Sequence, residues 1–289
     1  MKTEYFPLTQ KDLDILNFVK GLQASDHAIL FYNDLKNCRQ ALFTFLKAGM
    51  DKGEAAVYVA GRETSKQNQK ATDEFSVNVK RYEMVGALKV VNYDEWYIIN
   101  GKIDIPNIIM SWRKAVDAAK ERGFKGMRVC SEMSCFFRRN LVNEMVEYEK
   151  ACDRRLEIPM TAICAYDLNL LTPLGEKLFL DVLKTHSHIL FAEPDLGFNV
   201  TLEAVDDVLE KVLGNLSKGV LFSNLRNFFG LSREDIPKMF IDFRSALEKT
   251  FGDMTAGLLE NMIFRELYLK LTNGAYVPHG GLKNEGVST

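Results

Sequence analysis

Two acidic residues follow predicted strands at positions that could support catalysis or binding. Glu132 comes shortly after the apolar run Gly126–Cys130, and Asp167 follows the run Thr161–Tyr166, with one helical pattern between the runs. A strand–helix–strand unit brings both strand ends to one edge of a parallel sheet, where open α/β sheets bind ligands. Two carboxyl groups there could divide the roles of general acid and general base. Carboxylates at strand ends also cap the next helix, so the sequence leaves both roles open.

Other polar side chains fall in the same layer of strand ends. Tyr32, Arg62 and Ser134 could hydrogen-bond a small polar ligand, with Phe136 and Phe137 as an apolar wall. The sequence contains no GxSxG and no HExxH motif, and these residues form no set of nucleophile, base and orienting group. The pattern favours binding without turnover.

Histidine and cysteine offer a second kind of chemistry. His186 and His188 alternate along a strand and could chelate a metal, although a helix C-terminus alone also favours histidine. Cys130, Cys135 and Cys164 fall near the same edge and could bind a soft metal or sense redox state. None of them forms a CxxC pair, and buried cysteine commonly packs as a small apolar residue.

Alternating strands and helices must position these groups. Short apolar runs predict strands, and patterns with apolar residues three and four apart predict helices. The predicted strands are His27–Tyr32, Ala55–Ala60, Val77–Tyr82, Leu88–Val91, Gly126–Cys130, Thr161–Tyr166 and His188–Phe191. The predicted helices are Thr9–Leu22, Asp34–Gly49, Thr64–Phe75, Pro106–Gly123, Asn140–Leu156 and Pro173–Lys184. This alternation predicts an α/β fold with a mostly parallel sheet flanked by helices.

The pattern becomes helical only after Glu193. Residues 192–199 (AEPDLGFN) suggest a linker, and four helices are expected after it, at Leu202–Leu216, Gly219–Phe229, Ser232–Phe251 and Thr255–Leu271. We therefore expect an α/β domain at 1–195, a small all-α domain at 196–272 and a disordered tail at 273–289.

The helical region fits a protein interface better than a DNA-binding surface. Its basic residues, such as Arg233 and Arg244, alternate with acidic ones such as Glu234 and Asp242. A DNA-reading helix instead clusters its positive charges. We expect these helices to form a homodimer or to dock a protein partner.

The overall composition and two missing motifs narrow the function classes. The formal net charge is −2, which gives no general attraction to nucleic acid or to an acidic membrane. An odd number of cysteines, five, and the absence of a long apolar run predict a cytoplasmic protein without a disulfide framework or membrane span. The sequence also lacks GxxxxGK[ST] and GxGxxG, and Asp34 would repel phosphate after the first strand.

Six segments, taken in order, resemble a known family. They read HAILFY, AGMDKGEAAVYVA, FKGMRVCSEMS, LVNEMVEYEKACD, TAICAYDLN and FLDVLKTHSHILF, between about Asp26 and Glu193. The set resembles the MEDS domain, the methanogen/methylotroph DcmR sensory domain. The resemblance implies a RecA/KaiC-like fold that lacks the phosphate loop and senses small hydrocarbon derivatives or related metabolites. The family's characteristic positions fall on His27, Tyr32, Gly53, Glu132, Met133, Ser134, Tyr148, Glu149 and Tyr166.

The C-terminal helices resemble a second kind of module, and one residue of the chain differs from the MEDS pattern. The segment from GVLFSNLRNFFGLSRED to LLENMIFRELYLKL is similar to a helical output module at the ends of archaeal signalling proteins. Where many family members carry tryptophan after the EMS triplet, this chain has Cys135. A shared aromatic wall is therefore in doubt.

The leading hypothesis is a sensor that binds a small organic ligand and relays its state through the helices. The expected ligand-binding residues are Tyr32, Arg62, Glu132, Ser134, Asp167, His27, Tyr148 and Glu149. His27 and Tyr148 stand at less obvious places, since His27 opens its strand at the opposite edge and Tyr148 fits core packing equally well. We expect no catalytic residue, no cofactor and no metal. The alternatives are a degenerate nucleotide-binding protein or an enzyme using Glu132 and Asp167, a thiol or metal redox sensor, and a pure assembly module.

Overall fold

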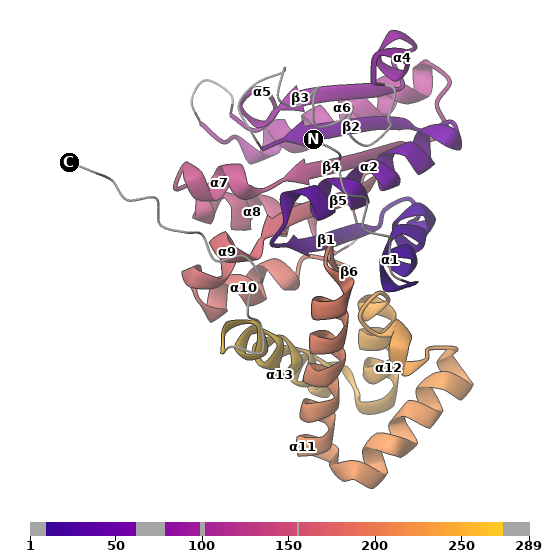
Figure 1. Cartoon of the computed structure of the whole chain (residues 1–289), viewed down its shortest axis with the longest axis vertical. Helices are drawn as coiled ribbons and strands as arrows, with labels where there is room; N and C mark the ends of the chain where they lie inside the picture. The colour runs from indigo at the N-terminus through magenta and orange to yellow at the C-terminus, as the bar shows by residue number, and fades with distance from the viewer. Residues whose placement is uncertain (1–9, 62–78, 99–101, 155, 274–289) are drawn as a thin grey trace, which may run out of the picture.

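A six-stranded parallel sheet forms the centre of the molecule, in the order β3-β2-β4-β5-β1-β6. The computed structural model describes residues 10–61, 79–98, 102–154 and 156–273 of the chain. The strands are β1 (His27–Tyr32), β2 (Ala55–Ala60), β3 (Leu88–Asn92), β4 (Met127–Glu132), β5 (Thr161–Asp167) and β6 (His188–Phe191). Figure 1 shows the sheet in the upper part of the molecule with helices on both sides. The predicted α/β class is confirmed.

The sheet is buried on both faces because its strands are continuous apolar runs. Successive side chains of a strand point to opposite faces, so β1 divides its residues between two cores. Ile29 and Phe31 pack in the larger core with the helices that follow β3, β4 and β5, and with the C-terminal helices. Ala28, Leu30 and Tyr32 pack in the smaller core beneath the two N-terminal helices.

Helices cover the sheet on both faces. The smaller core lies under α1 (Gln10–Gly21) and α2 (Leu35–Asp51). The remaining helices of the α/β region are α4 (Val79–Met84), α5 (Tyr93–Trp96), α6 (Ile105–Glu121), α7 (Ser134–Arg138), α8 (Val142–Cys152), α9 (Leu168–Leu171), η1 (Thr172–Leu174) and α10 (Glu176–Leu183). Asp34 caps α2 by accepting hydrogen bonds from the backbone N–H groups of Lys36 and Asn37, so the predicted helix start is confirmed.

Two predicted elements differ in the structure, and a third cannot be compared. The described part of the predicted strand Val77–Tyr82 is the helix α4, because a short apolar run alone does not distinguish the two structures. The predicted helix Ser232–Phe251 is η2 (Arg233–Asp235) followed by α12 (Phe240–Phe251). Pro237 lies between them, and proline lacks the N–H group that a continuous helix needs there. The predicted helix Thr64–Phe75 lies outside the described residues.

The C-terminal region is helical, as predicted, but it is not separated by an irregular linker. Helix α11 (Pro194–Phe229) begins inside the segment expected to be a linker. Gly214, with φ 75°, replaces the expected gap between two helices by a kink, which Figure 1 shows at the lower end of the molecule.

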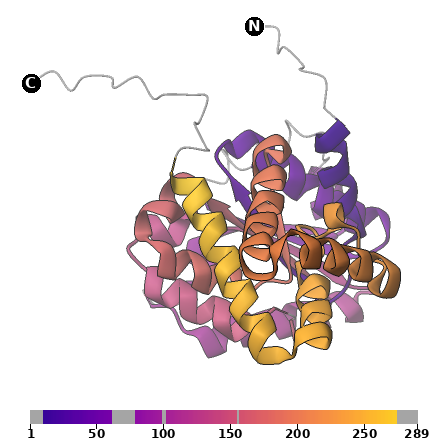
Figure 2. The ribbon, with the colours of Figure 1, turned by 90° about the horizontal axis from the view of Figure 1, so that it is seen from below.

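The sheet and the C-terminal helices share one apolar core. Helix α13 (Asp253–Thr272) lies beside α10 and α11, as the view from below shows (Figure 2). Phe179 of α10 packs against Tyr268 of α13 with a ring distance of 5.5 Å. Within the described residues, no helix has both the length and the apolar character to cross a membrane.

Candidate functional site

The Glu132 carboxylate lies where the order in which the chain adds strands to the sheet reverses. The chain leaves β2 toward β3 and leaves β4 toward β5, so the two connections diverge. Crevices at the carboxyl ends of such strands are the usual binding sites of open α/β sheets. Glu132 ends β4 at this position, and only 1% of its surface is exposed.

Three donors surround the Glu132 carboxylate. Its Oε1 atom accepts a hydrogen bond from Arg39 Nε at 2.9 Å and another from the Tyr58 hydroxyl. Its Oε2 atom accepts from the Gly61 backbone N–H at 3.3 Å. A Cβ atom at Gly61 would lie 2.8 Å from the Glu132 Cβ atom, so the close approach requires glycine there. Glu132 is thus a buried, neutralised carboxylate.

Tyr32 and Ser134 lie beside Glu132, as the sequence predicted for residues of one layer. Both are buried, and burial raises the pKa of Tyr32, with further contributions from Cys38, Glu132 and Asp167. The Ser134 hydroxyl forms a hydrogen bond with the Tyr32 hydroxyl and partly opposes that shift in the pKa of Tyr32. Tyr32 therefore stays protonated and serves as a neutral hydrogen-bonding group.

Asp167 caps a helix. It ends β5 and accepts a hydrogen bond from the backbone N–H of Asn169 at 3.0 Å, at the start of α9. Of the two roles that the sequence left open, capping is thus observed. Glu132 is held by Arg39 and Tyr58, and Asp167 holds a helix end.

A cavity of about 380 Å³ opens at this edge of the sheet, between the ends of β1 and β5 and the last helix. Its lining comes from the residues that follow those strands and from the end of α13: Asn33, Leu168, Asn169, Thr172, Pro173, Tyr268, Leu271 and Thr272. All of these side chains are uncharged. The Tyr268 hydroxyl donates to the Thr172 carbonyl oxygen at 3.2 Å and fixes α13 against this edge.

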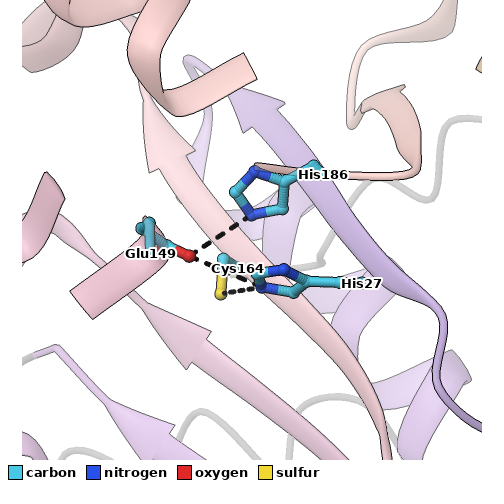
Figure 3. Close-up of side chains that lie close together, drawn as sticks. All are labelled: His27, Glu149, Cys164 and His186. Atoms are coloured by element: carbon cyan, nitrogen blue, oxygen red, sulfur yellow. Dashed lines mark hydrogen bonds and ion pairs between the residues drawn. The ribbon is translucent and has the colours of Figure 1, made fainter. Parts of the chain in front are cut away.

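A second group of polar side chains lies inside the sheet's larger core. His27, Glu149, Cys164 and His186 come from β1, α8, β5 and the turn before β6, and their ligand atoms lie within 4.8 Å of one another. Figure 3 shows the four side chains converging on one point. The Glu149 Oε2 atom lies 3.5 Å from His27 Nε2 and 3.7 Å from His186 Nε2. His27 Nε2 lies 3.4 Å from Cys164 Sγ.

The backbone fixes both imidazole rings. His27 Nδ1 lies 2.8 Å from the Asp153 carbonyl oxygen and 3.0 Å from that of Thr185. His186 Nδ1 lies 2.8 Å from the Val182 carbonyl oxygen. Carbonyl oxygens only accept, so both Nδ1 atoms carry a proton, and the two Nε2 atoms face the carboxylate.

Burial governs protonation in this group. It raises the pKa of Glu149, and the nearby His27 and the Tyr166 hydroxyl, which donates to Glu149 Oε1, oppose this rise. Burial also raises the pKa of the Cys164 thiol, with Glu149 adding to the rise. It lowers the pKa of His186 well below the usual value, so that ring is neutral near pH 7.

The structure thus divides the predicted site residues into separate places. Tyr32, Glu132 and Ser134 lie together at the carboxyl edge of the sheet, while His27 and Glu149 lie in the interior group. Tyr148 belongs to the core, where its hydroxyl accepts from Trp112 Nε1 at 3.0 Å. Arg62 lies outside the described residues.

The three thiols and the two histidines that could have bound a metal do not come together as sets. Cys130 packs in the smaller core, whereas Cys135 and Cys164 pack in the larger one across the sheet, because neighbouring strand residues face opposite ways. His186 and His188 also separate, and His188 Nε2 faces Asp26 Oδ1 at 3.5 Å.

Sequence reasoning missed two features. The partners of Glu132, Arg39 and Tyr58, lie 93 and 74 positions away from it, and no local pattern indicates such pairs. The interior group was missed as a set, although His27 and Glu149 were both candidates. The only available signal was a rare one: histidine and glutamate inside segments that otherwise pattern as core.

The comparison with protein families identifies the α/β region. The family model described as the methanogen/methylotroph DcmR sensory domain, MEDS, matches residues 26–187. The chain belongs to the MEDS family. The MEDS region therefore contains the strands β1 to β5, the residues Tyr32, Glu132 and Ser134 at the carboxyl edge, and the interior group. It ends just before β6.

Two further comparisons were less informative. No curated protein matches the chain. Among solved structures, the chain is similar to a KaiC-like protein from the hyperthermophilic archaeon Pyrococcus horikoshii, with 15% identity and a TM-score of 0.38. The match covers 50% of this chain and 62% of that protein, so it spans less than two thirds of either.

Proposed function

We propose that this MEDS protein is a sensor that binds a small, uncharged organic molecule at the carboxyl edge of its sheet and relays binding through α13. The observation that carries the proposal is the composition of the cavity wall. Asn33 and Asn169 follow strands of the sensory domain, whereas Tyr268, Leu271 and Thr272 belong to the last helix. A ligand in this cavity would contact both parts at once.

The cavity supports a particular class of ligand. Its volume of about 380 Å³ is at the small end of the range for ligand sites. The lining combines apolar side chains with amide and hydroxyl groups, and it offers no charged partner to an ionic ligand. A short hydrocarbon chain with one or two hydroxyl, carbonyl or amide groups fits this chemistry.

Asn33 supplies the most direct support. Its Oδ1 and Nδ2 atoms are buried, and neither has a hydrogen-bond partner within the described part of the chain. An unpaired buried amide is unfavourable by roughly 1 to 3 kcal/mol. Rotation of the Asn33 side chain toward the cavity would let a ligand with a donor and an acceptor remove that cost. Asn33 directly follows β1, at the wall of the cavity.

The β1–α2 turn supports this proposal over nucleotide binding. The backbone N–H groups of Asn33 and Asp34 point to the Glu193 carboxylate, at 3.3 Å and 2.9 Å. The next N–H groups, of Lys36 and Asn37, donate to Asp34 Oδ1. Two carboxylates thus occupy the amides that a phosphate would need, and their charge repels it. Calorimetry with ATP and Mg²⁺ is expected to show no binding.

A relay through α13 requires that ligand and helix influence each other. A ligand shifts an equilibrium only if it binds the two states differently. Because α13 also carries Glu260, which lies 2.8 Å from Arg154 of the sensory domain, movement of α13 would alter a second contact between the two parts. Exposed apolar side chains on the second half of α11, including Leu216, Val220 and Phe228, offer a surface for a partner or second copy.

The test combines a retained ligand with a blocked cavity. Native mass spectrometry of the freshly purified full chain should show a small molecule released on denaturation. Thermal shift assays with short alcohols, ketones and amides should then identify neutral compounds that stabilise the chain. Thr272→Trp, at the exposed end of the cavity wall, should abolish both effects.

Leu258→Trp is the matched control, since Leu258 lies on the same helix and is 60% exposed away from the cavity lining. It should bind like the wild type. Hydrogen exchange at the end of α13 should slow with ligand in the wild type and in this control only. Equal ligand responses in Thr272→Trp and wild type would refute binding in this cavity.

A further inference from the structure

The interior group of His27, Glu149, Cys164 and His186 is a ligand set for one metal ion. We propose that it binds a divalent transition metal, with Zn²⁺ as the best fit. One thiolate, two imidazoles and one carboxylate are the donor types that zinc takes in proteins, and four donors complete its usual coordination. This site is separate from the cavity at the carboxyl edge and does not depend on ligand binding there.

Several distances within the group suit the ligands of one metal ion, and all four ligand atoms lie within 4.8 Å of one another. A hydrogen bond between a carboxyl oxygen and an imidazole nitrogen spans roughly 2.7 to 3.2 Å. The two that separate Glu149 Oε2 from the histidines are 3.5 Å and 3.7 Å. Four ligands at ordinary Zn–N, Zn–O and Zn–S bond lengths are about 3.3 to 3.6 Å apart. The 3.4 Å between His27 Nε2 and Cys164 Sγ falls in the same range.

Two of the atoms that face the centre of the group lack a hydrogen-bond partner of ordinary geometry. Glu149 Oε2 and His186 Nε2 are buried and have no hydrogen-bond partner among the described residues. Both Nδ1 protons point away from the centre, toward backbone carbonyl oxygens. An oxygen of Glu149 and a ring nitrogen of the neutral His186 therefore lie close together in an apolar core, with the Cys164 thiol as a weak nearby donor. A cation bound between them would stabilise this arrangement.

The surroundings match the outer shell of protein metal sites. A metal-binding histidine usually donates its second N–H to a backbone carbonyl or a carboxylate, and a metal-binding carboxylate usually accepts a further hydrogen bond. Here both rings donate to carbonyl oxygens, and Glu149 Oε1 accepts from the Tyr166 hydroxyl. These contacts leave one atom of each residue directed inward.

The position of the site gives the metal a structural role. The ligands connect helix α8 to the neighbouring strands β1 and β5 and to the turn before β6. All four residues are at most 5% exposed, so no side of the site opens to solvent. On binding, Zn²⁺ forms a bond to Cys164 Sγ, and the thiol proton leaves to solvent. The metal would thus fasten β6, which continues into α11, to the sensory domain.

Zinc content and cobalt spectroscopy of the full chain test the proposal. The chain, purified without added chelator, should retain about one Zn²⁺ per molecule, as four-ligand structural sites do. After replacement by Co²⁺, the spectrum should show a thiolate-to-cobalt charge-transfer band and the strong visible bands of tetrahedral Co²⁺. Cys164→Ser should lose the charge-transfer band, and His186→Gln should bind Zn²⁺ far more weakly.

Two control variants separate the site from chance binding. Cys152→Ser changes another buried thiol in the same core, and His188→Gln changes a buried histidine beside Asp26. Both should keep the metal and the cobalt spectrum. Tyr166→Phe removes the outer hydrogen bond to Glu149 and should weaken Zn²⁺ by about 10- to 100-fold while keeping the charge-transfer band.

Folding is checked by circular dichroism of each variant with and without chelator. If a variant fails to fold, the zinc content and the cobalt spectrum of the wild type still test the proposal. A folded wild-type chain that neither retains zinc nor gives a thiolate–cobalt band at neutral pH would overturn the proposal. Equal zinc affinity in the wild type, Cys164→Ser and His186→Gln would overturn it as well, because the metal would then lie elsewhere.

Discussion

Glu132 and Glu149 are both fully buried glutamates of the same domain, but their surroundings differ. Glu132 faces a permanent cation, Arg39, together with the hydroxyl of Tyr58 and a backbone N–H. Glu149 faces two imidazole nitrogens and a thiol, and its donors are the Tyr166 hydroxyl and the weakly donating Cys164 thiol. The chain therefore neutralises one carboxylate with its own charge, and the other needs a proton or a metal ion.

The two sites therefore differ in whether the groups around the carboxylate can change their charge. An arginine does not lose its charge in a protein, so the counter-charge beside Glu132 is permanent over the physiological pH range. Histidine, cysteine and a buried carboxyl group can all exchange protons, and metal binding changes their protonation. Two predictions test this comparison, and two more concern Asn33 and Glu193; they are given in order of decreasing expected effect.

The largest effect should follow removal of the Arg39 charge. Arg39→Met leaves Glu132, which is 1% exposed, without a counter-charge and should lower the free energy of unfolding by about 3 kcal/mol. Urea denaturation measures this loss. The double variant Arg39→Met with Glu132→Gln should recover most of it. Arg113→Met breaks an exposed ion pair with Glu157 and should cost less than about 1 kcal/mol.

Glutamine substitutions compare the two carboxylates directly. Glu132→Gln leaves Arg39 half-buried without an anion and should cost about 2 kcal/mol. Glu149→Gln, measured with a metal chelator present, should change stability by less than about 1 kcal/mol, because the amide still accepts from Tyr166 and removes a buried charge. A larger loss for Glu149→Gln than for Glu132→Gln would show that Glu149 is ionised and stably paired without metal.

A substitution at Asn33 should weaken ligand binding without lowering stability. Asn33→Ala removes a buried amide that has no partner within the described structure, so the free energy of unfolding should stay within about 1 kcal/mol of the wild type or rise. The affinity for the ligand found in the thermal shift assay should fall about tenfold, the value of one hydrogen bond. Asn107→Ala, whose amide donates to Asp104 at 2.7 Å outside the cavity, should leave affinity unchanged.

The smallest effect concerns pH and Glu193. Burial raises the pKa of Glu193 above its ordinary value of 4.5, and Asp34 adds to the rise, while hydrogen bonds from Asp34 and Asn33 oppose it. The folded state therefore binds its proton more tightly than the unfolded state. The resulting stabilisation is present below pH 4.5 and is lost as pH rises through the higher folded pKa. Glu193→Gln should remove this part of the pH dependence, amounting to about 1 kcal/mol or less between wild type and variant. Identical pH profiles of unfolding for the two proteins would contradict it.

Much of the α/β fold could be predicted because its signals are local. β1, β2 and β5 are continuous apolar runs, and Asp34 and Asp104 mark the starts of α2 and α6. The errors arose where a local signal was ambiguous. Residues 192–199 look like a linker because of their proline and glycine, yet proline at the start of α11 is also a normal helix beginning.

The sequence alone determined the fold class, the strand ends that carry Tyr32, Glu132 and Asp167, and the resemblance to the MEDS family. The tertiary structure decided which polar groups meet. It joined His27 to Cys164 and His186 across 137 and 159 positions of the chain, and it joined Glu132 of β4 to Arg39 of α2. Local patterns record backbone geometry and burial, which depend on neighbouring residues. The partners of a buried charge depend on how strands and helices pack, and no short stretch of sequence contains that information.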